Sequence, residues 1–139
     1  MKTMKSVVFY EPHKLEAEER PVPEIGGPEV LIKVHSCGIC GSDQEYYSGG
    51  SPVQTPTGKG PLILGHELTG EVVDLGDGAE ALGILKAGDR VAVNPVQYCH
   101  ACPKCLSGAP NLCQRASVLG VSTDGGFAQY CKADFRALY

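Results

Sequence analysis

The chain has 139 residues, of which 42% are hydrophobic, and its formal net charge is −4. This length suits one domain of ordinary size. The sequence has no cluster of Lys and Arg and no run of about 18 apolar residues, which argues against a nucleic-acid-binding surface and a membrane span. The N-terminus lacks the pattern of a signal peptide. Seven cysteines, an odd number with clustered spacing, favour metal thiolates in a reducing cytoplasm over disulfides.

Short β-strands are the elements that the sequence predicts most often. Eighteen Gly and ten Pro indicate many turns. Strands are expected over 5–10, 15–20 (a weaker one), 29–35 (the clearest, apolar and β-branched), 62–75 with breaks at Gly65 and Gly70, 89–95 and 127–132. One short helix over 43–47 and a Gly- and Pro-rich loop over 49–61 complete the pattern. The fold class is therefore predicted to be mainly β, a barrel-like domain with few short helices and one metal-binding excursion.

The segment GDGAEA at 76–81 follows a predicted strand and matches the glycine fingerprint of dinucleotide-binding loops. Such a fingerprint also needs a helix that begins at the glycines. Gly83 and Gly88 fall where that helix would run, so the segment is predicted to be a plain loop between two strands.

Four cysteines form the most specific motif of the chain, C-x2-C-x2-C-x7-C at Cys99, Cys102, Cys105 and Cys113. Four thiolates can surround one tetrahedral zinc ion, and such a closed site is structural because it leaves no coordination position for substrate. The rival is an iron–sulfur cluster, whose ferredoxin motif shares the first two spacings but has a gap of three residues before a final Cys-Pro. The sequence therefore favours a structural zinc lobe over about 95–116.

A second metal site is suggested by Cys40, His66 and Glu67, in the segments CGICGSD at 37–43 and GHE at 65–67. A sulfur, an imidazole and a carboxylate are the three protein ligands that a catalytic zinc with one open position can use. Adjacent residues of an ideal strand point to opposite faces, so His66 and Glu67 can share an ion only if the backbone bends, which Gly65 permits.

These motifs together resemble the zinc-containing medium-chain alcohol dehydrogenases, specifically their N-terminal GroES-like catalytic domain. The segments that carry the resemblance are CGICGSD at 37–43, GHE at 65–67, AGDRVAV at 87–93, the four-cysteine lobe and LGVSTDGGFAQY at 119–130. The resemblance covers nearly the whole chain and implies a partly open GroES-like β-barrel. GHE combined with CGSD is most similar to the sorbitol (polyol) and threonine dehydrogenase branch.

The resemblance implies a role for each matching residue. Cys40 and His66 are expected to bind the catalytic zinc, with Glu67 as a ligand or a near neighbour that exchanges with water. Ser42 is expected to receive the substrate's alcohol proton, and Asp43, which could also cap a helix, to orient His66. Glu45 stands where many relatives have a His that passes the proton to solvent, and Tyr46 is expected near the substrate. The four cysteines of the lobe are expected to hold the structural zinc.

The expected domain is 1–139, a GroES-like N-terminal catalytic domain, while the Rossmann domain that binds NAD(P) in the family is absent from this chain. The sequence is therefore interpreted as a fragment, inactive alone, of an NAD(P)-linked dehydrogenase that oxidises a secondary alcohol or polyol to a ketone. A small-molecule alcohol substrate, no nucleic acid, no membrane and a homo-oligomeric full-length protein are also expected. The alternative is a zinc-stabilised GroES-like binding or structural module without catalysis. A co-chaperonin is disfavoured because it has no use for the metal ligands.

Overall fold

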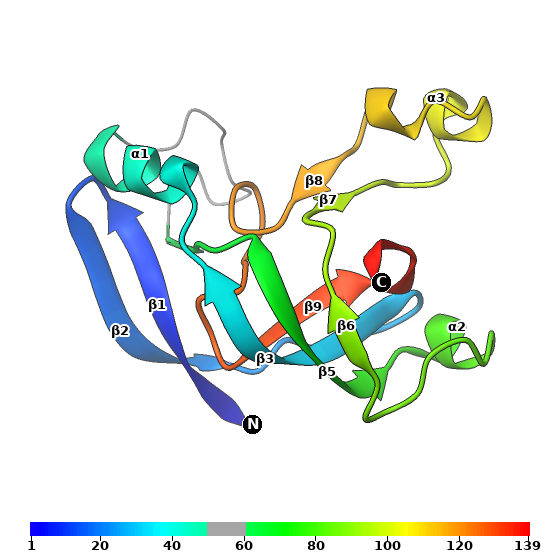
Figure 1. The fold of residues 1–139 in the computed structure, drawn as a ribbon, viewed down its shortest axis with the longest axis horizontal. Coiled ribbons are helices and arrows are strands. Elements are labelled where there is room, and N and C mark those ends of the chain that lie inside the picture. Colours follow the sequence, from blue (N-terminus) through cyan, green and yellow to red (C-terminus); the bar gives the residue numbers. More distant parts are fainter. Residues whose placement is uncertain (50–60) are drawn as a thin grey trace.

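Two antiparallel sheets contain most of the strands in the computed structural model, which describes residues 1–49 and 61–139 (Figure 1). The first sheet has the order β2-β1-β4 and the second the order β6-β5-β3-β9. A separate two-stranded ribbon pairs β7 with β8. The bounds are β1 (Thr3–Glu11), β2 (Lys14–Pro21), β3 (Glu29–Gly38), β4 (Leu62–Ile63), β5 (Glu67–Leu75), β6 (Arg90–Ala92), β7 (Val96–Gln97), β8 (Ser117–Val118) and β9 (Tyr130–Asp134). The mainly-β prediction is confirmed, and the described strands form no closed barrel.

The strands follow the period-2 pattern expected of half-buried sheets. In β1, Met4, Ser6 and Val8 are buried while the residues between them face outward. The weaker strand predicted over 15–20 is β2, a charged edge strand, and charges on an edge discourage pairing with other chains.

Two apolar clusters form the interior around the site described below. The larger one packs β3, β5, β6 and β9 together and includes Val30, Ile32 and Val72, which are fully buried. The smaller one joins Phe9, Tyr46, Leu62, Leu64 and Val121. The side chain of Tyr46 thereby fixes helix α1 (Gly41–Gly49) to the first sheet.

The remaining helices are short. They are α2 (Asp77–Glu80), α3 (Pro103–Leu106) and the 3-10 turns η1 (Pro110–Leu112) and η2 (Phe135–Ala137). In the described part of the chain, no helix combines the length and the apolarity needed to cross a membrane. Figure 1 shows α3 at the end of the β7–β8 ribbon, away from both sheets, as a projecting lobe.

Several predicted boundaries were wrong. The strand predicted over 62–75 is two strands, and it breaks at Gly65 as expected but not at Gly70, which lies inside β5. A Cβ at Gly70 would lie 2.6 Å from Ile32 Cγ2, so the glycine is there because the neighbouring strand comes close. The last strand begins at Tyr130, three residues later than predicted, and the strand expected over 89–95 is limited to Arg90–Ala92. The loop predicted over 49–61 lies almost wholly outside the described residues.

The GDGAEA segment contains one helical turn, α2, where a plain loop was predicted. The turn ends after four residues, with Ala81 as its C-cap, and Gly83 follows with a φ of +63°. Several N–H groups at the start of the turn already have partners: Gly76 N donates to Glu29 O, Gly78 N to Asp77 Oδ1 and Ala79 N to Gly27 O. Because these donors are used within the protein, the described segment does not present the row of free N–H groups with which a helix start binds a dinucleotide phosphate.

Candidate metal centres

Two groups of side chains bring metal-ligating atoms within 4.8 Å of one another in the described residues. One is Cys99, Cys102, Cys105 and Cys113, and the other is Cys40, His66 and Glu67. These are the two sets that the sequence predicted. The structure shows that each set is assembled, while the roles of the residues remain predictions.

The sulfurs of the four cysteines lie close enough together for a tetrahedral metal site. Cys99 Sγ lies 3.9 Å from Cys105 Sγ, and a tetrahedron with metal–sulfur bonds of about 2.3 Å has edges of about 3.8 Å. Backbone N–H groups point at the sulfurs: Cys102 N donates to Cys99 Sγ at 3.3 Å, and Arg115 N donates to Cys113 Sγ at 3.4 Å. Such donors favour the thiolate that a metal requires. The cysteine set fits a structural zinc ion.

The thiols of this lobe differ in acidity. The backbone N–H of Ala101 lowers the pKa of Cys99 to about 6, whereas burial raises the pKa of Cys105 to about 12. Binding of a metal to all four sulfurs therefore requires the release of protons.

Very little apolar burial supports the lobe. Across residues 95–116, Cys102 alone is buried, and the apolar side chains of Leu106 and Leu112 are exposed. Cys102 is also the N-cap of α3, followed by Pro103 at the first helical position. The N-cap and the proline favour the helical turn of α3, but the apolar burial within 95–116 is too small to stabilise the lobe by itself.

The second site is built by the pairing of β3 with β5. In that antiparallel register Gly38 lies opposite Glu67, which places Cys40, just beyond β3, near His66, just before β5. Gly65 has φ +93°, so the chain turns before His66, and β5 begins only at Glu67. The turn removes the objection that adjacent strand residues point to opposite faces, and both side chains reach the same place.

Asp43 links the two ligand-bearing segments from the first turn of α1. It is 4% exposed, and its Oδ2 accepts a hydrogen bond from Cys40 N at 2.9 Å. Its other oxygen, Oδ1, lies 3.8 Å from His66 Nδ1, and both of these buried atoms lack a hydrogen-bond partner among the described residues. A metal on the far ring nitrogen would fix the ring and leave Nδ1 facing Asp43. The orphaned pair and the mixed sulfur, imidazole and carboxylate donors therefore fit a three-ligand zinc site.

The other predicted residues of the site lie on α1. Ser42 is half-buried and Glu45 is exposed, and since they are three residues apart on a helix their side chains are neighbours. Tyr46, expected near the substrate, is 8% exposed and packs in the smaller apolar cluster, where burial raises its pKa. The ring of Tyr46 therefore contributes to the packing of α1, and its contact with a substrate stays a prediction.

Sequence reasoning overlooked the glycine between the two cysteines of C-G-I-C. A Cβ at Gly38 would lie 2.8 Å from Glu67 Oε2, so glycine at this position leaves room for the carboxylate beside the end of β3. Sequence reasoning also gave no role to Asp124, although its segment carried part of the resemblance. The signal was the run of Asp124, Gly125 and Gly126, a composition typical of a turn.

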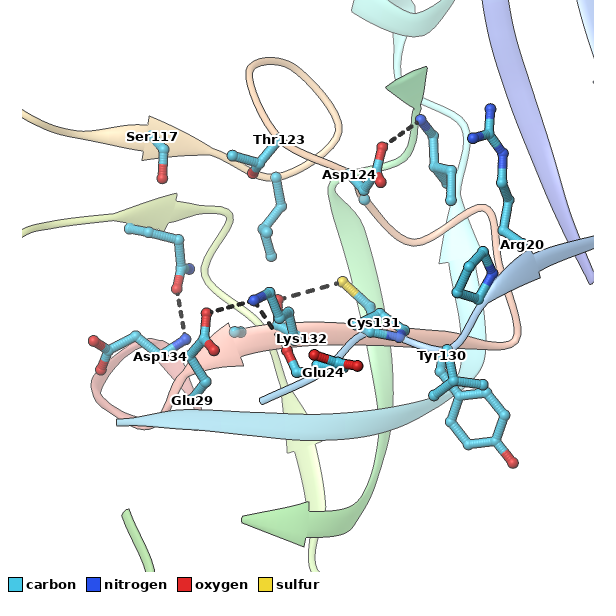
Figure 2. Close-up of a pocket in the computed structure, with 18 of the residues that line it drawn as sticks. Arg20, Glu24, Glu29, Ser117, Thr123, Asp124, Tyr130, Cys131, Lys132 and Asp134 are labelled. Atoms are coloured by element: carbon cyan, nitrogen blue, oxygen red, sulfur yellow. Dashed lines mark hydrogen bonds and ion pairs between the residues drawn. The ribbon is translucent and has the colours of Figure 1, made fainter. Parts of the chain in front are cut away.

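A cavity of about 860 Å³ lies between the start of β1, the end of β2 and β9 (Figure 2). Its charged groups are paired within the protein: Lys132 Nζ lies 2.8 Å from Glu29 Oε1 and donates to Glu24 O. Its walls include none of the residues of either metal set. The cavity is therefore separate from the candidate chemistry.

Comparison with known proteins gave consistent matches. Residues 26–139 match the family model described as the alcohol dehydrogenase GroES-like domain. The chain is 42% identical over 130 residues to L-galactonate-5-dehydrogenase of Escherichia coli K12, covering 94% of this chain and 36% of that protein. It is also 42% identical over 130 residues to sorbitol dehydrogenase of Bacillus subtilis 168, covering 93% and 36%.

A solved structure of an alcohol dehydrogenase from E. coli CFT073, complexed with NADH, has a TM-score of 0.83 to this chain and 38% sequence identity. The match covers 99% of this chain and 38% of that one. The chain thus spans little more than a third of the length of the relatives it matches.

Proposed function

The chain belongs to the family of alcohol dehydrogenase GroES-like domains, and from this premise we propose that it supplies the metal-binding catalytic part of a zinc-dependent dehydrogenase. The reaction is the oxidation of a secondary alcohol, a polyol or a sugar-derived acid, to a ketone, with NAD(P)+ accepting the hydride and one proton released. The observation that carries the proposal is the convergence of Cys40, His66 and Glu67 on one point beside the buried Asp43.

Zinc held by Cys40, His66 and Glu67 would supply Lewis acidity that lowers the pKa of the substrate hydroxyl. The protein's own residues then handle the proton. The Ser42 hydroxyl receives it, and Glu45, one turn further along α1 and exposed, passes it to solvent. Asp43 holds Cys40 through the backbone N–H and faces His66, so that one carboxylate sets the position of two ligands.

The substrate class is supported by the polar side chains of α1 and by the names of the relatives. Glu45 and the exposed Tyr47 can exchange hydrogen bonds with several hydroxyl groups. Each hydrogen bond that a polyol hydroxyl makes with these exposed groups, and that a simple alkanol cannot make, favours the polyol by about 0.5–1.5 kcal/mol. The relatives are a galactonate dehydrogenase and a sorbitol dehydrogenase. We place the protein in the cytoplasm because its free cysteines need a reducing compartment, and we expect a homo-oligomer.

The test measures kcat/KM of the whole gene product, loaded with zinc, for sorbitol, xylitol, threonine, galactonate and ethanol with NAD+ and NADP+. A polyol or sugar acid should be oxidised faster than ethanol. His66→Gln should abolish oxidation, because it removes a ligand. The matched control is His35→Gln, which removes an exposed imidazole 3.9 Å from the Glu71 carboxylate and should leave the rate unchanged.

If no alcohol in the panel is oxidised, or if His66→Gln is as active as the parent, the catalytic proposal fails. The binding-module alternative then remains, because it requires only the zinc of the four-cysteine lobe. If ethanol is the best substrate, only the polyol assignment fails.

A further inference from the structure

The backbone before His66 is hydrogen-bonded to the loop between β8 and β9, much later in the chain. Ile63 N donates to Asp124 Oδ1 at 3.0 Å, and Gly125 N donates to Ile63 O at 2.8 Å. Gly126 N then donates to Gly65 O at 2.8 Å, so these bonds extend to the residue that precedes His66. The positions of these backbone groups therefore depend on the loop as well as on strand pairing.

Glycines, which have no side chain, allow this loop to contact both of the segments that carry metal ligands. A Cβ at Gly120 would lie 2.5 Å from Gly65 O, and a Cβ at Gly126 would lie 3.0 Å from Cys37 Sγ. A Cβ at Gly65 would itself lie 2.8 Å from the same sulfur. Cys37 stands three residues before Cys40 at the end of β3. The loop therefore packs against the Cys40 segment and the His66 segment at once.

Asp124 is the one side chain of this loop that fixes the His66 segment by a described hydrogen bond, which Figure 2 draws as a dashed line. The acceptor is a carboxylate, and a backbone N–H bonded to an ionised acceptor is held more strongly than one bonded to a neutral group. The bond joins residues 61 positions apart, so it acts between segments that local structure does not connect.

We propose that Asp124 is a positioning residue for the Cys40–His66–Glu67 metal site, which it controls without touching the metal or the substrate. It fixes Ile63 and, through the next two residues, sets where the His66 ring meets Cys40. The inference rests on the proposed function, because it assumes that this site binds a metal. If the bond between Ile63 and Asp124 only stabilises the fold, loss of the Asp124 carboxylate lowers the stability and leaves the metal site unchanged.

The test is a Co2+ titration of the purified protein. The contribution of the open site is taken as the part of the absorption spectrum that is absent in Cys40→Ser. Asp124→Asn keeps an acceptor oxygen but removes the charge, and Asp124→Ala removes the acceptor. We expect Asp124→Asn to weaken Co2+ binding at the open site by about 10-fold, the lower limit for residues that hydrogen-bond a metal ligand directly, because Asp124 acts on His66 through the intervening backbone. Its ligand-field bands should shift, and the four-cysteine site should be unaffected. Asp124→Ala should have the larger effect.

Asp77→Asn is the matched control. Asp77 Oδ1 accepts a backbone N–H from Gly27 at 2.9 Å, a pair 50 residues apart, and lies on α2 at the other end of the second sheet (Figure 1). The Asp77→Asn variant should have a less stable fold than the parent, but its Co2+ affinity at the open site should be within about twofold of the parent's.

The proposal is overturned if Asp124→Asn lowers stability as Asp77→Asn does while the open site keeps its affinity and bands. It is equally overturned if both metal sites weaken together. If Asp124→Ala does not fold, Asp124→Asn alone decides. A parent protein that binds no Co2+ at the open site overturns this proposal and the proposed function together. A parent that binds Co2+ but oxidises no alcohol overturns the proposed function alone.

Discussion

Gly65→Ala tests whether the turn before His66 needs glycine for its backbone angle, for its packing, or for both. Gly65 has φ +93°, and its added Cβ would lie 2.7 Å from Phe127 Cδ1 and 2.8 Å from Cys37 Sγ. A side chain in left-handed backbone costs about 1–2 kcal/mol. Overpacking of a filled interior costs a further 1–3 kcal/mol or so. We therefore expect Gly65→Ala to lower the free energy of unfolding by about 2–5 kcal/mol.

Gly83→Ala is the control that separates the two contributions. Gly83 also has a positive φ, +63°, but an added Cβ would have no heavy atom within 4 Å. Only the backbone cost of about 1–2 kcal/mol applies there. The entropy that alanine removes from the unfolded chain is similar at both positions and cancels in the comparison. The difference between the two variants, about 1–3 kcal/mol, therefore measures the packing alone.

Equilibrium unfolding in urea, followed by circular dichroism of the zinc-loaded protein, is the assay. A difference of about 1–3 kcal/mol moves the midpoint by roughly 1 M, since the slope for small proteins is about 1–3 kcal/mol per molar urea. If the midpoints of the two variants coincide, the packing argument is wrong. If Gly65→Ala loses stability but keeps the Co2+ bands of the open site, the turn matters for the fold and not for the ligand set.

Three further outcomes are expected. Cys113→Ser should lose one zinc per chain and make 95–116 sensitive to protease, because a structural zinc contributes about 10 kcal/mol in small peptides and little packing replaces it here; unchanged zinc content and protease resistance would sink the claim. Hydrogen bonds from Tyr10 and then Arg20 lower the pKa of Glu18 below its ordinary 4.5, so its contribution to stability is complete above that value and is lost as the pH falls through the lower folded-state pKa. Urea unfolding at a series of acidic pH values should therefore show a shallower loss for Glu18→Gln, and identical curves would refute the linkage. The 139-residue chain alone should produce no NAD(P)H from any alcohol, because its described residues contain no loop and helix that could hold a nicotinamide within about 3–3.5 Å of the carbinol carbon; turnover in a preparation free of host dehydrogenases would contradict this.

The sequence by itself determined the features whose parts lie close together in the chain. The four cysteines fall within 15 residues, so their spacing alone predicted the lobe, and the structure brings their sulfurs together. The apolar, β-branched pattern from Glu29 predicted the central strand β3, because side-chain alternation is a local property. The motifs also predicted the family, which the match over residues 26–139 confirms.

Only the tertiary structure decided how the open site is assembled. Cys40 and His66 are 26 positions apart, and the register of β3 against β5 is what places them together. A shift of one residue would have moved every side chain of the strand to the other face. Glu67 could be placed beside His66 only once the positive φ of Gly65 was seen, because a sequence shows that glycine permits a turn and not that the turn occurs.

The contacts that Tyr46 and Asp124 make in the fold also could not be predicted from the sequence. Tyr46 was expected near the substrate, and the structure shows in addition that it packs in the interior, because the contacts of α1 with the first sheet decide which face of a short helix is buried. Asp124 gave no local signal of its partner, since its bond to Ile63 spans 61 positions. Local patterns predict which residues can bind a metal, whereas the long-range bonds and close backbone contacts that fix those residues exist only in the folded chain.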